Sequence, residues 1–95
     1  MKPKIGILES THPDGVKLLK KIGKVYLDVN LSKAELYKKI CNYNIVIIKS
    51  NIQIDEKFIN CVKRLKIVAR AGTGVDNINL EYLKKKIKKF FKIKQ

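Results

Sequence analysis

The sequence has no tryptophan, one histidine and two cysteines, and these scarcities exclude several kinds of site. A single histidine, His12, cannot build a His-based metal centre from this chain alone, and we expect it on an exposed loop. Cys41 and Cys61 have neither a metal-ligand nor a redox spacing. In a reducing compartment we therefore expect both to be small buried side chains, with no disulfide and no metal.

Long apolar runs are also missing. The longest aliphatic run is Ile45–Ile48, far below the roughly 18 residues that a membrane span requires. The apolar stretch Ile5–Leu8 behind Lys2 and Lys4 is too short for a signal peptide. With 95 residues, 45% of them hydrophobic, the chain is expected to form one small globular domain in the cytoplasm.

Acidic residues are few, and the resulting charge is uneven. Eight acidic residues face 22 basic ones, which gives a net charge of +14. Residues 84–95 hold seven lysines and no acid, so half of the excess lies in this tail. A net positive charge of this size is typical of nucleic-acid-binding proteins. Because half of it lies in the tail, the charge of the remaining residues has to be considered separately.

Short apolar runs alternate with helical patterns four times along the chain. The expected strands cover residues 4–8, 24–28, 45–48 and 67–69. This order, with short connections, predicts an α/β fold: a single, doubly wound, flavodoxin-like domain with a parallel sheet of four to five strands. We expect the domain to cover residues 1–86, followed by a basic tail over residues 87–95 that is either a fifth strand or an extended helix.

Polar residues at fixed offsets mark the starts of the helices. Ser32 with Glu35 is the pattern of a capping box, ahead of a helix that should end near Cys41. Asp55 and Asn79 are the expected caps of two later helices.

The first helix is expected to begin at a Thr11 cap and to end at Gly23. It is expected to run through the apolar residues Val16, Leu18, Leu19 and Ile22.

A ligand site in such a sheet lies beyond the carboxyl ends of the strands, where the strand order reverses. With the order 2-1-3-4, the loops 9–12, 49–53 and 70–77 meet there. The candidate groups in these loops are Lys49, Ser50, Gly72, Thr73, Gly74, Asp76 and Asn77. A lysine beside backbone N–H groups that converge at two glycines would suit a carboxylate or phosphate. On the residues alone, ordinary turns and helix caps remain the alternative.

Other functions of doubly wound domains fit these loops poorly. A phosphorylatable receiver needs an aspartate at the end of the third strand, where this chain has Lys49. A flavodoxin needs a glycine-rich phosphate loop after the first strand, and Ser10–Asp14 lacks that pattern. A dinucleotide fingerprint needs a glycine three residues beyond Gly74, where Asn77 stands.

The nine residues Arg70–Ile78 read RAGTGVDNI. This motif resembles the signature that ends the fourth strand in the substrate-binding domain of D-isomer-specific 2-hydroxyacid dehydrogenases, and among them it is most similar to the phosphoglycerate-type enzymes of serine biosynthesis. Lys49-Ser50 stands where this family usually has Arg-Ser. The resemblance covers residues 3–86, including the order of the elements.

The resemblance implies a role for each matching position. Backbone amides at Thr73 and Gly74 would hold the carboxylate of a small carboxylate- or phosphate-bearing 2-hydroxy acid, and Lys49 and Ser50 would contact the same molecule. Lysine in place of arginine turns a bidentate fork into a point charge. Ile52 stands where the family commonly has threonine, which removes a hydroxyl.

The family's cofactor domain, which binds NAD, and its catalytic arginine, glutamate and histidine have no counterpart in this sequence. The resemblance therefore implies NAD for the family but no cofactor and no dehydrogenase activity for this chain alone.

The lysine-rich tail supports two further hypotheses. Its lysine, isoleucine and phenylalanine content suggests a frameshift or early stop that altered a longer enzyme. As a continued helix, the tail would instead present an apolar stripe to an anionic partner, a membrane surface or nucleic acid, through Leu83, Ile87, Phe90 and Phe91. We favour packing of this stripe on the domain's own sheet or on a second copy in a homodimer, rather than binding of nucleic acid or membrane.

Overall fold

The computed structural model describes residues 2–72, 74, 76–86 and 89–93, and strands alternate with helices through them. The strands are β1 (Lys4–Ile7), β2 (Lys24–Leu27), β3 (Ile45–Ile48), β4 (Ile67–Ala71) and β5 (Lys89–Ile93). The helices are α1 (Pro13–Ile22), α2 (Lys33–Lys39), the 3₁₀ helix η1 (Ile40–Asn42), α3 (Glu56–Cys61) and α4 (Leu80–Lys85). None of the described helices is both long and apolar enough to cross a membrane.

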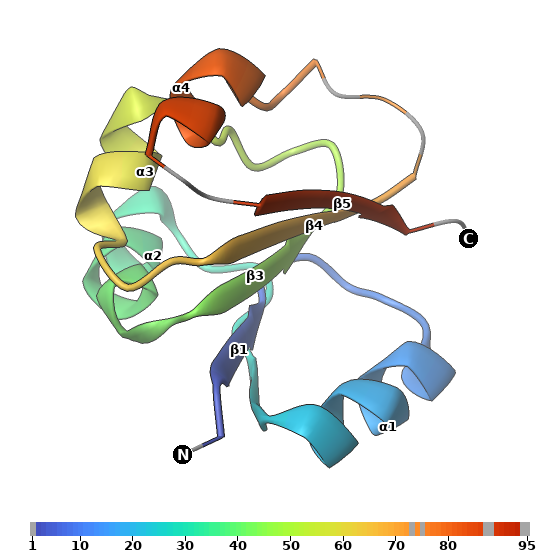
Figure 1. The fold of residues 1–95 in the computed structure, drawn as a ribbon. Helices are drawn as coiled ribbons and strands as arrows, with labels where there is room; N and C mark the ends of the chain where they lie inside the picture. Colours follow the sequence, from blue (N-terminus) through green and yellow to red (C-terminus); the bar gives the residue numbers. More distant parts are fainter. Residues whose placement is uncertain (1, 73, 75, 87–88, 94–95) are drawn as a thin grey trace.

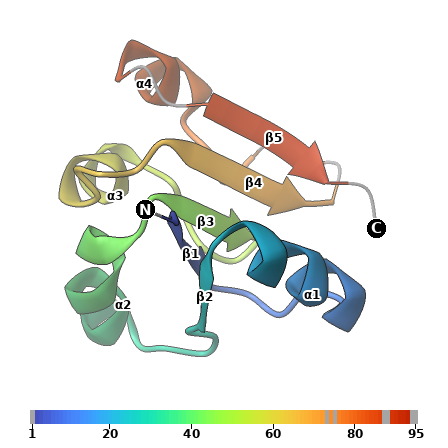
Figure 2. The ribbon, with the colours of Figure 1, turned by 60° about the horizontal axis from the view of Figure 1, so that its bottom comes forward.

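The five strands form one parallel sheet in the order β2-β1-β3-β4-β5. The order reverses between β1 and β3, because the chain first adds β2 on one side of β1 and then adds β3 on the other. Figures 1 and 2 show α1 on one side of the sheet and α2, α3 and α4 on the other. The predicted doubly wound, flavodoxin-like fold is therefore confirmed, including the order of the first four strands.

Each face of the sheet has its own apolar core. The larger core lies under α2, α3 and α4 and includes Val46, Ile48, Phe58, Val68 and Leu83. The smaller core lies under α1 and contains Ile5, Ile7, Ile47 and Ala69, with Val16 and Leu19 packed against it. Successive residues of β3 thus enter opposite cores, which explains why this strand is apolar at every position.

Three of the four predicted helix starts are confirmed. Ser32 and Glu35 form the expected capping box, and the side chains of Asp55 and Asn79 accept from the backbone N–H groups of Phe58 and Tyr82. At α1 the cap is His12, not the expected Thr11, because His12 Nδ1 accepts from the backbone N–H of Asp14 at 3.1 Å.

The helix expected through Val16, Leu18, Leu19 and Ile22 is confirmed as α1, but only two of these four side chains face the sheet. Leu18 and Ile22 are 63% and 59% exposed, whereas Val16 and Leu19 pack against the smaller core. Adjacent residues of a helix point about 100° apart, so Leu18 and Leu19 cannot both face the sheet. Apolar spacing alone did not indicate which of the two does.

The tail residues 89–93 form β5, so of the two expected alternatives the fifth strand is found and the extended helix is not. α4 ends at Lys85, and β5 pairs in parallel with β4. Phe90 packs against the larger core, whereas Phe91 is 52% exposed, because successive strand residues point to opposite faces. The expected stripe also included Ile87, which lies outside the described residues, and a homodimer that covers Phe91 stays a prediction.

The expected burial of the cysteines is wrong for Cys41. Both cysteines are free thiols; Cys41 is exposed in η1, and Cys61 is partly buried at the end of α3. The η1 turn buries Ile40 instead and leaves its neighbour on the solvent side.

The capping box at the start of α2 predicts a pH effect. Hydrogen bonding by Ser32, first through its side chain and then through its backbone N–H, holds the pKa of Glu35 below its ordinary value of 4.5. Because the folded-state pKa is lowered, the box stabilises α2 fully above pH 4.5 and loses this contribution as the pH falls through the folded-state pKa. We expect Ser32→Ala to raise the pKa of Glu35 towards 4.5 in an NMR titration. Ser10→Ala, at an exposed serine outside the helices, should leave it unchanged.

Candidate functional site

Two loops, which we call the lysine loop (residues 49–53) and the glycine loop (residues 72–77), leave the sheet side by side. They follow the adjacent strands β3 and β4, in which Ile48 pairs with Arg70. Beyond the loops, Ile54 and Ile78 form a parallel bridge, and the Ile54 N–H donates to the Asn77 carbonyl at 2.8 Å. The two loops therefore share the carboxyl end of the sheet, which is where ligands bind in folds of this class.

The side chain of Asn77 joins the two loops. It is 6% exposed, and its Nδ2 donates to the backbone carbonyls of Lys49 and Ile52, each at 2.8 Å. Its Oδ1 accepts from Arg70 Nε at 3.0 Å. One buried carboxamide thus fixes the lysine loop, the glycine loop and the end of β4 relative to one another.

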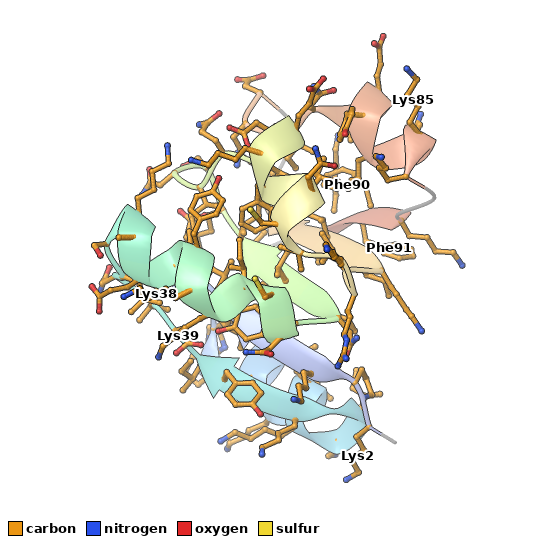
Figure 3. All side chains as sticks on the ribbon, turned by 90° about the vertical axis from the view of Figure 1, so that its left-hand side faces the viewer. Lys2, Lys38, Lys39, Lys85, Phe90 and Phe91 are labelled. Carbon is orange, nitrogen blue, oxygen red and sulfur yellow. The ribbon has the colours of Figure 1, made fainter. Side chains whose placement is uncertain are left out.

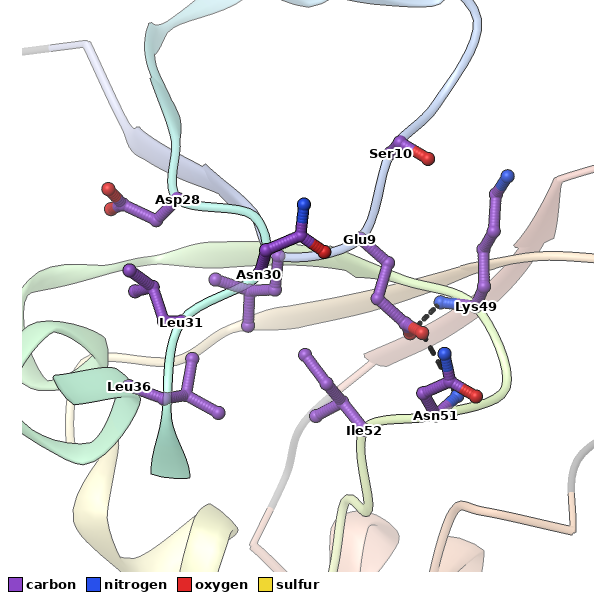
Figure 4. Close-up of a pocket in the computed structure, with 10 residues that line it drawn as sticks. Glu9, Ser10, Asp28, Asn30, Leu31, Leu36, Lys49, Asn51 and Ile52 are labelled. Carbon is purple, nitrogen blue, oxygen red and sulfur yellow. Dashed lines mark hydrogen bonds between the residues drawn. The ribbon is translucent and has the colours of Figure 1, made fainter. Parts of the chain in front are cut away.

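The carboxylate of Glu9 holds the lysine loop from its other side. Its Oε2 accepts from the backbone N–H of Lys49, and its Oε1 accepts from that of Asn51 at 3.0 Å. Figure 4 shows the carboxylate directed at these two backbone groups, while the Lys49 ammonium extends towards Ser10 and away from Glu9. Glu9 therefore binds backbone N–H groups of the loop and Asn77 binds its carbonyls, which fixes the base from which the Lys49 side chain projects.

Arg70 lies directly beneath the glycine loop. A Cβ atom at Gly72 would come within 2.8 Å of Arg70 Nη1, and one at Gly74 within 3.4 Å of Nη2. Gly72 also has a φ of 121°, which residues with a Cβ rarely adopt. Arg70 is 8% exposed, so a largely buried guanidinium places a permanent positive charge behind these two glycines.

A pocket of about 320 Å³ opens beside the lysine loop (Figure 4). Its lining comes from the segments that follow β1, β2 and β3 and from α2: Leu8, Glu9, Ser10, Asp28, Asn30, Leu31, Leu36, Lys49, Asn51 and Ile52. The lining combines aliphatic side chains with polar ones, which are two amides, Ser10, Lys49 and the carboxylates of Glu9 and Asp28. Lys49 therefore lines this pocket, while its backbone carbonyl bonds to Asn77 of the glycine loop.

The remaining predicted residues fall into different surroundings. Ser50 is exposed and Gly74 is half-buried, whereas Thr73 lies outside the described residues. Asp76 is exposed although its neighbour Asn77 is buried. His12 caps α1 with its side chain 73% exposed. Within the described ranges, no three side chains of the metal-ligating types gather at one place.

Two residues of this site, Glu9 and Arg70, were not among the candidates from sequence. Arg70 had a signal, because it is a cation within an apolar run, but the strand was expected to end at Ala69 and in fact continues to Ala71. Glu9 reaches backbone groups 40 and 42 positions away. No local pattern reveals such a contact.

Comparisons with known proteins agree with this geometry. Residues 5–90 match the family model described as D-isomer specific 2-hydroxyacid dehydrogenase, catalytic domain. D-3-phosphoglycerate dehydrogenase of Methanocaldococcus jannaschii is 35% identical over 78 residues, which are 82% of this chain and 15% of that protein. The human enzyme of the same name is 38% identical over 79 residues, again 82% of this chain and 15% of that protein. The chain thus spans about 15% of the length of these curated relatives.

Solved structures give the same result. A protein of Pyrococcus horikoshii superposes with a TM-score of 0.90 at 28% identity, covering 98% of this chain and 28% of that one. The NAD⁺-bound 3-phosphoglycerate dehydrogenase of Entamoeba histolytica superposes with a TM-score of 0.84 at 26% identity, covering 97% of this chain and 33% of that one.

Proposed function

Because the chain belongs to the D-isomer specific 2-hydroxyacid dehydrogenase family, we propose that its lysine and glycine loops bind a small 2-hydroxy acid of the phosphoglycerate type. The observation that carries the proposal is the buried carboxamide of Asn77, which holds the two loops together at the end of the sheet. A site for a small acid needs donors from both loops at fixed positions, and this arrangement provides them.

Two cations near the loops can bind an anionic ligand, and the Glu9 carboxylate beside them is engaged with backbone N–H groups of the lysine loop. The Lys49 ammonium projects from the lysine loop, and the Arg70 guanidinium lies behind the glycines. A carboxylate would bind the backbone N–H groups of the glycine loop, including that of Gly74, while the ammonium of Lys49 and the hydroxyl of Ser50 bind a second oxygen-bearing group. Lysine provides a point charge and no planar fork, so we expect this site to accept either a carboxylate or a phosphate at that position.

The glycine loop does not fit a dinucleotide such as NAD. In a dinucleotide fingerprint, the pyrophosphate lies against the glycine turn at the start of a helix. Here the space beneath Gly72 and Gly74 is taken by the Arg70 guanidinium, and the position of the third glycine holds the buried, fully engaged Asn77. We therefore assign no step of hydride transfer to the described residues and propose that this chain alone binds the acid without oxidising it.

An NMR titration of the ¹⁵N-labelled chain with D-3-phosphoglycerate tests this proposal. We expect saturable shifts at Lys49, Ser50, Gly72 and Gly74. Lys49→Gln should weaken binding about 10- to 100-fold, because a hydrogen bond to a charged group contributes about 1.5–3 kcal/mol.

The matched control is Lys33→Gln, which removes an exposed lysine at the start of α2 and should leave the affinity unchanged. Shifts scattered over the surface, or equal losses in the two variants, would contradict the site. Formation of NADH by the purified chain with NAD and the acid would overturn the non-catalytic part of the proposal.

A further inference from the structure

All but one of the acidic residues of this protein lie at one end of the sheet. Of the eight, Glu9, Asp28 and Asp76 follow the carboxyl ends of β1, β2 and β4. The other five stand at the caps or in the first turns of α1, α2, α3 and α4. In a parallel α/β sheet each helix begins where a strand ends, so seven of the eight lie towards the carboxyl end, on the same side as the lysine and glycine loops. The exception is Asp28, whose carboxylate turns back to Lys39 and Tyr43.

The opposite end of the sheet is lined by basic residues. Lysines stand at the first positions of β1, β2 and β5, namely Lys4, Lys24 and Lys89. The connection between α3 and β4 adds Lys63, Arg64 and Lys66. The last turns of α1, α2 and α4 carry two lysines each. We call this side, formed by these strand starts, this connection and these helix ends, the amino-end face.

The amino-end face has basic residues on both sides of the central strand β3, which itself begins with Ile45. The backbone N–H of Lys89 donates to the carbonyl of Lys66 at 2.8 Å, and Lys4 pairs with Lys24. Figure 3 looks from the side on which β4 begins and shows Lys2, Lys38, Lys39 and Lys85 there, from both edges of the sheet. Among the described residues, one lysine of this face forms an ion pair: Lys39 bonds to the Asp28 carboxylate at 3.2 Å.

Helix dipoles explain only part of this segregation. Lysines in the last turn of a helix stabilise its negative end, which accounts for the pairs in α1, α2 and α4. Strand starts and the connection between α3 and β4 gain nothing from that effect, yet they are basic as well. Like charges gathered on one face repel one another and destabilise the folded chain, unless a partner of opposite charge binds there.

We propose that the amino-end face binds the phosphate backbone of double-stranded nucleic acid, without base specificity. Phosphate contacts need only cations on a broad surface. The molecule measures 30 × 27 × 26 Å, so its face spans roughly eight base pairs at about 3.4 Å each. This inference does not depend on the acid-binding site, which lies at the other end of the sheet.

An anionic membrane fits this face less well. A surface that inserts into a bilayer needs apolar anchors among its cations. Leu18, Leu27 and Phe91, three of the four large apolar side chains that are exposed in the described part of the chain, lie outside the amino-end face. The fourth, Ile22, is a single side chain at the end of α1.

The test is a fluorescence-anisotropy titration of a labelled 20-base-pair DNA duplex with the full chain over a range of salt concentrations. One triple variant, Lys63→Glu/Lys66→Glu/Lys89→Glu, reverses charges on the amino-end face. The matched control, Lys17→Glu/Lys33→Glu/Lys92→Glu, changes the net charge equally at exposed positions outside it. We expect the first triple to weaken binding at least about 100-fold and to reduce the salt slope by about 2–3, whereas the control changes the affinity less than about 10-fold.

Three results would overturn the proposal: equal losses in the two triples, no binding of the wild-type chain at 50 mM salt, or binding of phosphatidylserine vesicles without binding of the duplex. Circular dichroism shows whether each variant is folded. If the first triple does not fold, the same positions changed to glutamine are titrated against glutamine at the control positions. The proposal then requires that glutamine at the amino-end positions weakens binding of the duplex, whereas glutamine at the control positions does not.

Discussion

Asn77→Ala is expected to lower the free energy of unfolding by about 3 kcal/mol and to abolish detectable binding of D-3-phosphoglycerate. The substitution removes three hydrogen bonds and leaves Arg70 Nε and the carbonyls of Lys49 and Ile52 without their partner. Each buried polar group that loses its partner costs about 1–3 kcal/mol, most for a charged group. Binding should fail because the lysine and glycine loops lose the side chain that fixes their separation. Urea unfolding and the NMR titration measure the two effects.

Two variants show whether the carboxamide itself is responsible. Asp76→Ala changes the exposed neighbour and should alter stability by less than about 0.5 kcal/mol. Asn77→Asp keeps the acceptor for Arg70 but loses the donor to both carbonyls, so its effect on binding should resemble that of alanine. An Asn77→Ala chain that binds the acid as the wild type does would show that the two loops keep their positions without this side chain.

Gly6→Ala is expected to destabilise the fold by about 3 kcal/mol, because inserting atoms into a packed core forces the surrounding structure apart. A Cβ atom at Gly6 would lie 2.5 Å from Cδ2 and Cε2 of Tyr43. The ring cannot move aside easily, because Tyr43 is 2% exposed and its hydroxyl donates to the Asp28 carboxylate. A thermal or urea denaturation series measures the loss.

Gly15→Ala is the matched control for this prediction. Apart from its chain neighbours and the backbone of its own helix, no atom lies within 4 Å of a Cβ built at Gly15, which stands inside α1. Alanine is favoured over glycine in a helix by about 0.5–1 kcal/mol, so this variant should be more stable than the wild type. If Gly6→Ala were as stable as Gly15→Ala, the close packing of Tyr43 on β1 would be wrong.

Much of the fold could be predicted because it depends on local signals. Alternating apolar runs and helix caps indicated every strand through β4, and short connections between parallel strands permit few arrangements. The errors fell where two local choices are nearly equal in energy. His12 and Thr11 can each cap α1, and Leu18 and Leu19 can each face the sheet, so the backbone geometry and the tertiary packing decided.

The candidate site was less accessible to sequence analysis. Local patterns indicated some of its residues, namely the glycines, the lysine at a strand end and Asn77. The contacts that fix the two loops connect distant positions, as Glu9 does with Asn51, and depend on how β1, β3 and β4 come to be neighbours. Only the assembled sheet reveals them.

The distribution of charge also emerged only with the fold. In the sequence the basic residues seemed concentrated in the tail, and nucleic-acid binding was therefore not favoured. The folded chain brings basic residues from the starts of three strands and the ends of three helices to one side. This gathering, rather than the tail alone, is the basis for the proposed nucleic-acid contact.

The engagement of Asn77 with both loops has a consequence for protein engineering. An insertion or deletion in either loop would move the Lys49 or Ile52 carbonyl out of hydrogen-bonding distance of this side chain. A change in the length of one loop would therefore have to be matched by a change in the other. An exchange of this region with a related protein would have to move residues 49–53 and 70–77 together. Exchanging one without the other should yield a hybrid in which Asn77 no longer bonds to both loops.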